Sequence, residues 1–275
     1  MIKQKCIVMF SGGLDSRLVL KIMQEKDYNV TALYFKLPFS KDIEQEIREF
    51  CKKQKAKLKI IDYTKGKLLK NYLKMIKEPE YGRGAGFNPC IDCRLFMSQK
   101  ARQYANKNNI DIIASGEVLG QRPMSQTKKA IEIIDKKVEL VRPLTELGIS
   151  GRSRKKQMQM AKKFKISYPN PAGGCLLCEK GLKTRFKFLI KDNMINEKNL
   201  PLVNIGRHFI NSKRWIVLGR NAKENEIIHE TKGIKIIPKQ TGPSAWVSDK
   251  KLILKAKKLI KKYSKHNIKD FEILK

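Results

Sequence analysis

The chain reads Ser11-Gly12-Gly13-Leu14-Asp15-Ser16 directly after a short apolar run at residues 6–10 and directly before a helical pattern that continues to about residue 26. A strand, a tight turn and a helix start in this order bring backbone N–H groups and the positive end of a helix dipole to one point. The two glycines let the backbone approach a ligand closely, and the serine hydroxyls add hydrogen-bond donors. The segment therefore predicts a phosphate-binding loop.

Asp15 is unusual in a plain anion site, because a carboxylate repels phosphate unless a cation lies between them. We therefore assign Asp15 to Mg²⁺ or to the positioning of pyrophosphate. The loop lacks the Gly-Lys-Ser/Thr sequence, which excludes the ordinary P-loop of NTPases.

Short apolar runs alternate with helical patterns through the first half of the chain, which predicts βαβ units. The runs fall at residues 6–10, 30–35, 58–62 and 111–114, and the helical patterns at residues 16–26, 43–54, 68–77, 93–108 and 153–165. We expect an α/β fold with a doubly wound, mostly parallel sheet that binds ligands at the carboxyl ends of its strands.

The pattern changes near residue 184. From there we expect short strands at residues 187–190, 202–205, 215–218, 226–230 and 234–237, followed by a helix whose lysines surround one apolar face. We therefore expect two domains, a larger one over residues 1–183 and a smaller α+β domain over residues 184–275.

The composition is strongly basic, with 60 Lys and Arg against 26 Asp and Glu and a formal net charge of +34. Such a field favours a polyanion, and nucleic acid is the natural candidate. Codon bias toward Lys is the alternative explanation, but it does not account for the deficit of acidic residues. The apolar runs are far too short to cross a bilayer, so we expect a soluble cytoplasmic protein without a membrane partner.

Four of the six cysteines form two closely spaced pairs, Cys90 with Cys93 and Cys175 with Cys178. Three interpretations stay open: a catalytic pair that carries and resolves a persulfide, a [4Fe–4S] cluster, or a structural Zn²⁺ site. We expect Cys93 to lie closest to the start of its helix, where the dipole lowers the pKa of a thiol. Cys6 and Cys51 lie among apolar neighbours, where a core role is expected.

The hexapeptide at residues 11–16 resembles the pyrophosphate loop of the ATP pyrophosphatase (PP-loop) superfamily, whose members have the adenine nucleotide alpha hydrolase-like fold. This resemblance implies that ATP is split between its α and β phosphates. It also implies that Tyr34 and Phe35, in Leu33-Tyr34-Phe35, hold adenine. Gly116, in Ser115-Gly116-Glu117, would form the second nucleotide-contacting turn.

With Asn88-Pro89-Cys90-Ile91-Asp92-Cys93 and the later Gly-x-Cys loop Gly173-Gly174-Cys175, residues 1–180 resemble the tRNA thiouridine synthases, in particular the 2-thiouridylases. The resemblance implies a nucleophilic Cys93 and a partner at Cys175. It also implies a reaction in which ATP adenylates a uridine carbonyl oxygen of tRNA, sulfur from a donor attacks that carbon, and AMP leaves.

Two features depart from that pattern. Cys178 completes a second pair, which favours a metal or cluster version of the site with Cys90, Cys93, Cys175 and Cys178 as ligands. The last 92 residues are too few for the C-terminal barrel of the 2-thiouridylases. They resemble instead the small RNA-binding domain of ribosome-rescue (NFACT-type) proteins, through Gly206-Arg207-His208 and Gly242-Pro243-Ser244-Ala245-Trp246.

Two other functions remain as alternatives: a PP-loop enzyme of another class, such as an amidating ligase, and a non-catalytic RNA-binding protein with a structural zinc site. The paired cysteines favour sulfur transfer over nitrogen transfer. Arg122, just past the second nucleotide turn, is a further candidate for contacting the substrate base or the ATP phosphates.

Overall fold

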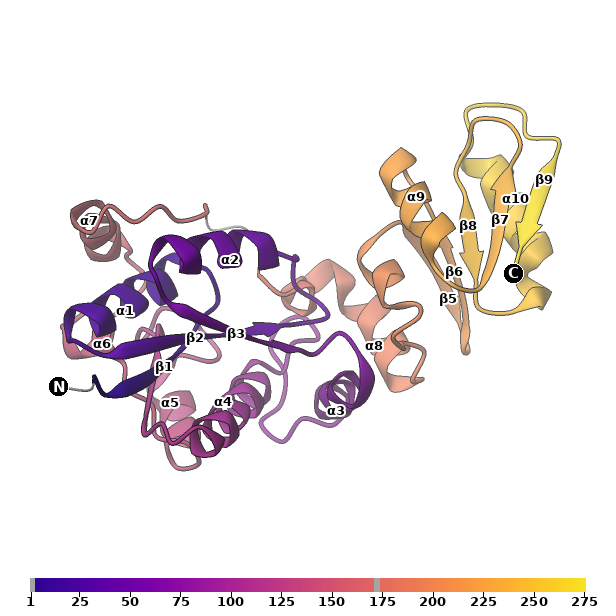
Figure 1. Ribbon diagram of the computed structural model, residues 1–275. Helices are drawn as coiled ribbons and strands as arrows, with labels where there is room; N and C mark the ends of the chain where they lie inside the picture. The colour runs from indigo at the N-terminus through magenta and orange to yellow at the C-terminus, as the bar shows by residue number, and fades with distance from the viewer. Residues whose placement is uncertain (1–2, 171–173) are drawn as a thin grey trace. The chain divides into compact units, whose positions relative to one another are not determined.

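The computed structural model describes residues 3–170 and 174–275, so Gly173 of the loop before Cys175 lies outside the described residues (Figure 1). The chain divides into two compact units. Unit 1 takes the chain up to Tyr63 and from Lys74 to Cys178, and unit 2 takes Thr64–Leu73 and Glu179–Lys275. The assignment of ATP binding and thiolation to a domain over residues 1–183, and of RNA binding to residues 184–275, stays a prediction.

Unit 1 is built on a four-stranded sheet in the order β3-β2-β1-β4, in which every pairing is parallel. The strands are β1 (Lys5–Met9), β2 (Asn29–Lys36), β3 (Lys57–Asp62) and β4 (Ile112–Ser115). The α/β fold with a parallel sheet is thus confirmed. The chain leaves β1 for β2 on one side and later adds β4 on the other, so the switch point of the sheet lies beside the carboxyl end of β1.

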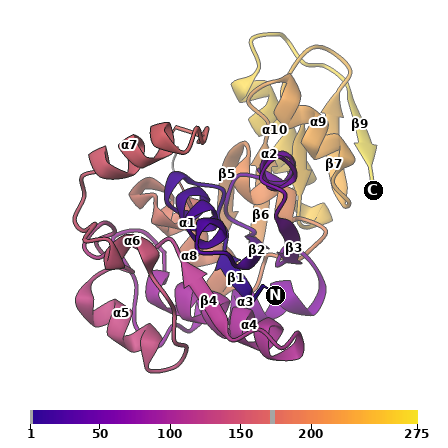
Figure 2. The same cartoon turned by 60° about the vertical axis from the view of Figure 1, so that its left-hand side comes forward.

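Helices cover both faces of this sheet, with α1 and α2 on one face and α4 on the other (Figures 1 and 2). The helices of unit 1 are α1 (Leu14–Glu25), α2 (Glu44–Lys53), α4 (Cys90–Lys107), α5 (Lys128–Asp135), α6 (Pro143–Glu146) and α7 (Lys155–Lys163), whereas α3 (Gly66–Lys77) has most of its residues in unit 2. Helix α7 packs against α1. The core between α1, α2 and the sheet is apolar, with Val8, Leu18 and Ile47 fully buried.

Two differences from the expected elements of unit 1 have local causes. Helix α4 begins at Cys90 rather than at Cys93, because Pro89 takes the N-cap position and proline suits a helix start, where its missing N–H is not needed. Helix α5, which we did not expect, begins after Thr127, whose Oγ1 accepts a hydrogen bond from the N–H of Ala130 at 3.2 Å.

Unit 2 contains an antiparallel sheet in the order β5-β6-β8-β7-β9. Its strands are β5 (Arg207–Asn211), β6 (Arg214–Leu218), β7 (Ile234–Pro238), β8 (Ala245–Val247) and β9 (Phe271–Leu274). Helix α10 (Ile253–Tyr263) covers the sheet, and its Ala256 and Ile260 are fully buried in one cluster with Ile216 and Ile236. Helices α8 (Lys183–Lys191) and α9 (Ala222–Glu230) complete the unit.

Three strands expected in this unit are wrong. Residues 187–190 belong to helix α8, residues 202–204 to the 3₁₀ turn Leu200–Asn204, and residues 226–230 to helix α9. A short apolar run does not separate a strand from a buried helix face. Within described residues 3–170 and 174–275, every helix is too short or too polar to cross a lipid bilayer.

The two motifs that carried the resemblance of the tail meet in one aromatic cluster. Trp215 Nε1 donates to His208 Nδ1 at 3.0 Å, and His208 Nε2 lies 2.7 Å from the carbonyl oxygen of Ile205. Since one ring nitrogen of His208 must accept and the other donate, the ring is neutral with its proton on Nε2. Trp246 packs edge-on against Trp215 with ring centroids 5.3 Å apart.

Burial and, secondarily, the charge of Arg185 lower the pKa of His208 from 6.5 to about 3. The ring therefore stays neutral in the folded protein at physiological pH. In the unfolded chain it would take up a proton near its ordinary pKa.

Gly206, at the entry to β5, cannot carry a side chain without distortion. Its φ is +72°, and a Cβ would lie 2.7 Å from the carbonyl oxygen of Leu218. We expect Gly206→Ala to destabilise unit 2 by roughly 2–4 kcal/mol. Both tryptophans of the chain lie in unit 2, so their fluorescence during urea unfolding measures this effect. Gly181→Ala is the matched control, because nothing lies within 4 Å of its added Cβ; equal unfolding midpoints for the two variants would contradict the prediction.

Acidification should destabilise unit 2, because the unfolded chain binds a proton at His208 that the folded chain excludes. The stabilisation is fully present above a pH of about 6.5 and is lost as the pH falls toward about 3, with about 1 kcal/mol lost by a pH of about 5.5. Urea unfolding followed by tryptophan fluorescence at two pH values measures this loss. The pH dependence should shrink in His208→Asn and persist in His266→Asn, whose side chain is exposed; an unchanged dependence in His208→Asn would show that another group is responsible.

Candidate nucleotide and thiol site

The loop between β1 and α1 presents the uncapped start of a helix. Gly13 is the N-cap of α1 in an extended conformation, and no described side chain caps the helix. Ser16 Oγ donates to the carbonyl oxygen of Gly13 at 3.0 Å, and Ser11 Oγ lies 3.2 Å from Ser16 Oγ. The first-turn N–H groups of α1 are therefore the donors open to a phosphate, whereas the two hydroxyls donate within the loop and must rotate before they can donate to a ligand.

Two glycines are needed for this geometry. Gly12 has φ +76°, and a Cβ there would lie 3.0 Å from Ile47 Cγ1. Gly116, which follows β4, packs so closely on the start of α1 that a Cβ would lie 2.8 Å from the backbone nitrogen of Ser16. The loops after the neighbouring strands β1 and β4 therefore form one continuous surface.

Arg17, which we did not single out from the sequence, stabilises the loop through hydrogen bonds to backbone carbonyls. Its Nε donates to the carbonyl oxygen of Gly12 at 2.7 Å, and its Nη1 donates to that of Ser167 at 2.7 Å. The guanidinium lies 4.4 Å from the centroid of the Phe50 ring. Because the side chain is buried and its hydrogen bonds go to backbone carbonyls, Arg17 stabilises the loop and does not face the ligand.

The Asp15 carboxyl is buried among cations and amides. Burial raises its pKa, while Arg154 and Arg122, and next the amides of Gln157 and Gln121, act in the opposite direction. Asp15 Oδ1 and both amide atoms of Gln157 are buried without a hydrogen-bond partner of normal geometry among the described residues. Carboxylate oxygens are ligands that Mg²⁺ prefers, so Asp15 fits the cation that we expected.

Glu117 connects the second turn to the helix that carries the first cysteine pair. Its carboxylate is fully buried, with Arg94 Nε 2.6 Å from Oε1 and Arg142 Nε 3.1 Å from Oε2. Arg142 also makes two hydrogen bonds of 2.9 Å to Asp135. Because Arg94 directly follows Cys93, this network fixes α4 relative to the nucleotide turn, and loss of one partner of a buried ion pair of this kind costs about 3–5 kcal/mol.

The residues expected to hold adenine lie at the end of β2. Tyr34 is 6% and Phe35 8% exposed. Tyr34 belongs to the apolar core, where burial raises its pKa, and the Phe35 ring stacks on Tyr63 with centroids 6.0 Å apart. Their contact with adenine stays a prediction.

The two cysteine pairs, which are far apart in the sequence, meet in unit 1. The 3₁₀ turn Leu176–Cys178 docks through two backbone hydrogen bonds, from Phe87 N to Leu177 O and from Leu176 N to Phe39 O, each 2.8 Å long. A Cβ on Gly86 would lie 2.3 Å from Leu177 O, so this approach requires a glycine.

The thiols of Cys90, Cys178 and Cys175 are joined by hydrogen bonds in that order. The bond to Cys178, together with burial, raises the pKa of Cys90, and the bond to Cys175 raises that of Cys178. Asn88 Nδ2 donates to Cys90 Sγ at 3.0 Å. The expectation that the helix start favours the thiolate of Cys93 rested on a wrong helix boundary, and at Cys90, the actual first residue of α4, burial and the thiol contact outweigh the dipole.

Cys93 lies one helical turn after Cys90, and its N–H donates to the carbonyl oxygen of Pro89 at 2.9 Å. It is close to the Tyr63 hydroxyl, whose pKa is raised first by burial and then by the charge of Cys93. Cys6 and Cys51 are buried, which raises their pKa values to about 12 and about 11. They therefore lie in the core, as the sequence indicated.

Arg122 links the nucleotide loop to the thiols. Its charge opposes the raised pKa of Asp15 and also those of Cys90 and Cys178, so its guanidinium acts on both parts of the site. Met124, on the same loop, lies 3.6 Å from Asn88 Nδ2 through its sulfur. The structure thus places the phosphate loop, the second turn and the hydrogen-bonded thiols around a single loop.

The four thiols are donors of the type that zinc or an iron–sulfur cluster takes. Over residues 3–170 and 174–275, no group of three or more His, Cys, Asp or Glu side chains is placed to hold a metal ion. Ligation of a cluster or zinc by Cys90, Cys93, Cys175 and Cys178 stays a prediction.

Comparison with known proteins gives partial matches. The chain is 24% identical over 170 residues to argininosuccinate synthase of Aquifex aeolicus, covering 60% of this chain and 40% of that protein. It is 28% identical over 118 residues to the tRNA-specific 2-thiouridylase MnmA 3 of Bacteroides fragilis, covering 42% and 31%. It thus spans less than half the length of these relatives. A solved 4-thiouridine synthetase–RNA complex with bound ATP is 17% identical, with a TM-score of 0.46, covering 73% of this chain and 52% of that one.

The family model described as thiamine biosynthesis protein (ThiI) matches residues 1–191, which is more than half of the chain. That range contains the phosphate loop, the Gly116 turn and both cysteine pairs. The chain therefore belongs to the ThiI family of PP-loop proteins.

Proposed function

We propose that this protein is an ATP-dependent sulfurtransferase that replaces a carbonyl oxygen of a tRNA uridine with sulfur. The observation that carries the proposal is the ion pair between Glu117 and Arg94, 2.6 Å long, which joins the turn beside the phosphate loop to the helix that carries Cys90 and Cys93. This reaction needs a site that adenylates the substrate and a site that carries sulfur, held together in one domain.

In the first step, the uridine carbonyl oxygen attacks the α-phosphorus of ATP and pyrophosphate leaves. The loop at residues 11–16 binds the phosphates through backbone N–H groups and the hydroxyls of Ser11 and Ser16. Asp15 would hold Mg²⁺, which neutralises charge on the leaving pyrophosphate. The Tyr34 and Phe35 segment and the Gly116 turn position the nucleotide.

In the second step, a persulfide sulfur on one cysteine, supplied by a sulfur donor, attacks the activated carbon and AMP leaves. A second thiolate then attacks the cysteine-bound sulfur, which leaves the thiocarbonyl on the RNA and a disulfide on the protein. An external thiol reductant restores both cysteines. Cys93 and Cys175 are assigned these roles by resemblance, and the contact of Cys175 with Cys178 and of Cys178 with Cys90 adds two thiols within exchange distance.

The RNA partner is supported by charge. The net charge of +34 and the lysines of α10, including Lys257, Lys258, Lys261 and Lys262, suit a phosphate backbone. The resemblance of unit 2 to an RNA-binding domain is consistent with this role, and cytoplasmic location belongs to the same proposal.

Loss of a sulfur-carrying thiol should uncouple the two steps. In Cys93→Ala, Cys175→Ala, Cys90→Ala and Cys178→Ala, ATP-dependent pyrophosphate release should persist, because none of these residues is in the phosphate loop. Sulfur incorporation, measured by mass spectrometry of tRNA nucleosides, should fall by roughly two orders of magnitude or more in the variants of the carrying and resolving cysteines. Cys51→Ala, a buried core position, should retain both activities.

Normal thiolation by all four variants would contradict the proposal. Iron, sulfide and zinc analysis of anaerobically purified protein separates the remaining chemistries. Iron and sulfide that are lost in Cys93→Ala and Cys175→Ala would establish a cluster, whereas stoichiometric zinc without labile sulfur would show that the thiols are structural. Metal-free, active protein is the result that we expect.

Arg122→Ala should weaken both halves of the reaction, because one positive charge acts on both. The pKa of the Cys178 thiol should rise further, so the pH midpoint of its alkylation by iodoacetamide should move upward, and pyrophosphate release should slow by about tenfold. Mass spectrometry of the alkylated peptide gives the first result. Arg152→Ala, also exposed, is the control; an identical response of the two variants would rule out a specific role for Arg122.

A further inference from the structure

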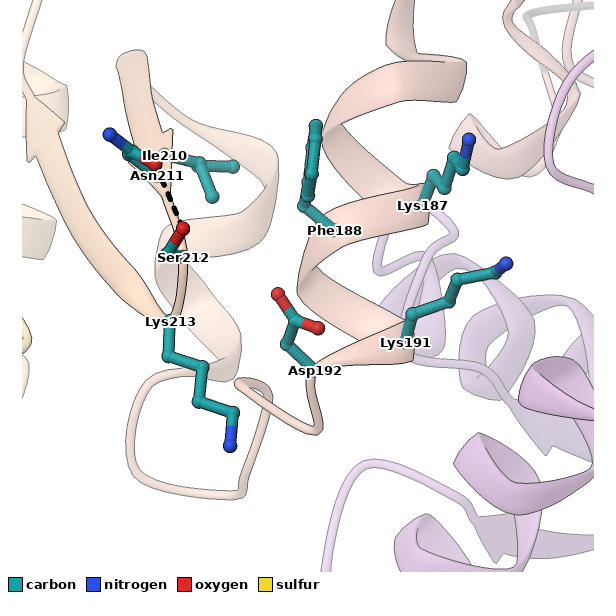
Figure 3. A pocket seen from close by; sticks show the side chains of 8 residues that line it. All are labelled: Lys187, Phe188, Lys191, Asp192, Ile210, Asn211, Ser212 and Lys213. Atoms are coloured by element: carbon teal, nitrogen blue, oxygen red, sulfur yellow. Dashed lines mark hydrogen bonds between the residues drawn. The ribbon is translucent and has the colours of Figure 1, made fainter.

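A hollow of about 420 Å³ lies in unit 2 between helix α8 and the tight turn that joins β5 to β6 (Figure 3). Phe188 and Asp192 point from α8 toward the turn, and Ile210 of β5 faces Phe188 across the hollow. The two apolar side chains thus form opposite walls, with a carboxylate at one end.

Phe188 is not needed for the core of unit 2. Its neighbours Phe186, Leu189 and Ile190 are 0%, 0% and 3% exposed and form the buried face of α8. Phe188 is 42% exposed on another side of the same helix. An aromatic ring held at the surface beside a hollow is typical of a site where a flat, apolar surface of a ligand binds.

Three lysines stand at the rim of the hollow. Lys187 and Lys191, one helical turn apart, extend from the other side of α8, and Lys213 extends from the turn. All three are exposed, so their side chains can follow an anionic chain that passes over the helix. Asp192 lies between Phe188 and Lys213 and offers hydrogen-bond acceptors to a ligand with amino or imino donors.

Lys213 lies in a turn whose backbone conformation is unfavourable for residues other than glycine. Ser212 and Lys213 have φ of +42° and +63°, although neither is glycine. A two-residue hairpin turn with two positive φ values usually carries Asn-Gly, so this turn gives up about 1–2 kcal/mol per residue. The lysine at the rim of the hollow therefore occupies a position where a glycine would be more stable.

The hollow is elongated. A second hollow of about 340 Å³ shares Asp192 and Lys213 with the first and continues past the side chains of Asn196 and Asn199. A groove with an aromatic wall and a basic rim suits a chain-like anion whose units carry flat rings.

We infer that this groove binds an unpaired segment of RNA, with one base stacked on Phe188, its edge against Asp192, and the adjoining phosphates at Lys187, Lys191 and Lys213. The inference rests on the proposed function in taking RNA as the substrate, and it adds the place and the mode of recognition. A base with an exocyclic amino group, such as cytosine, would donate to Asp192, whereas the uracil edge offers one donor flanked by two acceptors.

The test uses the full chain and a fluorescently labelled, unstructured oligocytidylate of about 12 nucleotides, with affinity measured by fluorescence anisotropy. Phe188→Ala should weaken binding roughly 5- to 150-fold, because stacking of one base contributes about 1–3 kcal/mol. Phe188→Trp should retain binding, since its ring also stacks. Leu254→Ala, which removes a side chain that is 74% exposed on α10, should leave affinity unchanged.

The rim lysines and Asp192 give independent readouts. Lys213→Ala should lower the slope of log affinity against log salt by about 0.7, the value for one phosphate of a single strand. Asp192→Asn should reduce the preference for oligocytidylate over oligouridylate. Wild-type affinity in Phe188→Ala, an unchanged salt slope in Lys213→Ala, or no binding by the wild-type chain would each overturn the inference.

The outcomes also separate the groove from the proposed function. If oligonucleotide binding depends on Phe188 but no tRNA is thiolated, the groove stands and the proposed function fails. If tRNA is thiolated and Phe188→Ala changes neither affinity nor the KM for tRNA, the function stands and the groove is wrong.

Discussion

The site depends on one close backbone contact, that between Gly116 and the first turn of α1. Strands β1 and β4 are neighbours with Met9 opposite Ser115, so the loops that leave their carboxyl ends meet without room for a side chain. This contact fixes where Glu117 begins its ion pairs with Arg94 and Arg142. Because Arg94 follows Cys93 on α4, the position of the first thiol pair is set by the same contact.

The thiols of Cys90, Cys178 and Cys175 differ from a single activated cysteine, because the pKa values of Cys90 and Cys178 are raised and not lowered. Hydrogen bonds from Cys90 to Cys178 and on to Cys175 stabilise the protonated forms of the first two, and burial adds to the effect at Cys90. Arg122 acts against this tendency from the nucleotide side. Because a protonated thiol is a weaker nucleophile than a thiolate, Cys90 and Cys178 are held in their less reactive form.

Local sequence was sufficient for the first part of the site. A strand, two glycines and a helix start are adjacent in the chain, so residues 11–16 and the parallel sheet could be predicted from pattern alone. The docking of Leu177 on Phe87 was not predictable, because it joins segments some 90 residues apart through backbone atoms. The role of Gln157 could not be predicted from the sequence either, because only its burial and its interaction with Asp15 distinguish it from other glutamines.

Unit 2 shows where periodicity misleads. The run at residues 187–190 reads as a strand, yet the burial of Phe186, Leu189 and Ile190 follows a helix. Strand β9 was missed because it is short and mostly exposed, and its pairing with β7 is long-range. In contrast, residues 215–218 are consecutive apolar residues with no polar residue between them, and all are buried. This is the pattern of a central strand, and they form β6, which lies between β5 and β8.

The division of the chain has a consequence for its covalent architecture. Thr64–Leu73, in the middle of unit 1 in sequence, belongs to unit 2, where the N–H of Gly66 donates to Glu197 at 3.0 Å. The polypeptide therefore passes between the units three times, and α3 carries one of these passages. After a single proteolytic cut behind Cys178, the segment Thr64–Leu73 would remain covalently part of the N-terminal piece although it belongs to unit 2. A C-terminal fragment produced alone would therefore lack these ten residues of unit 2. Unit 2 is therefore complete only in the intact chain.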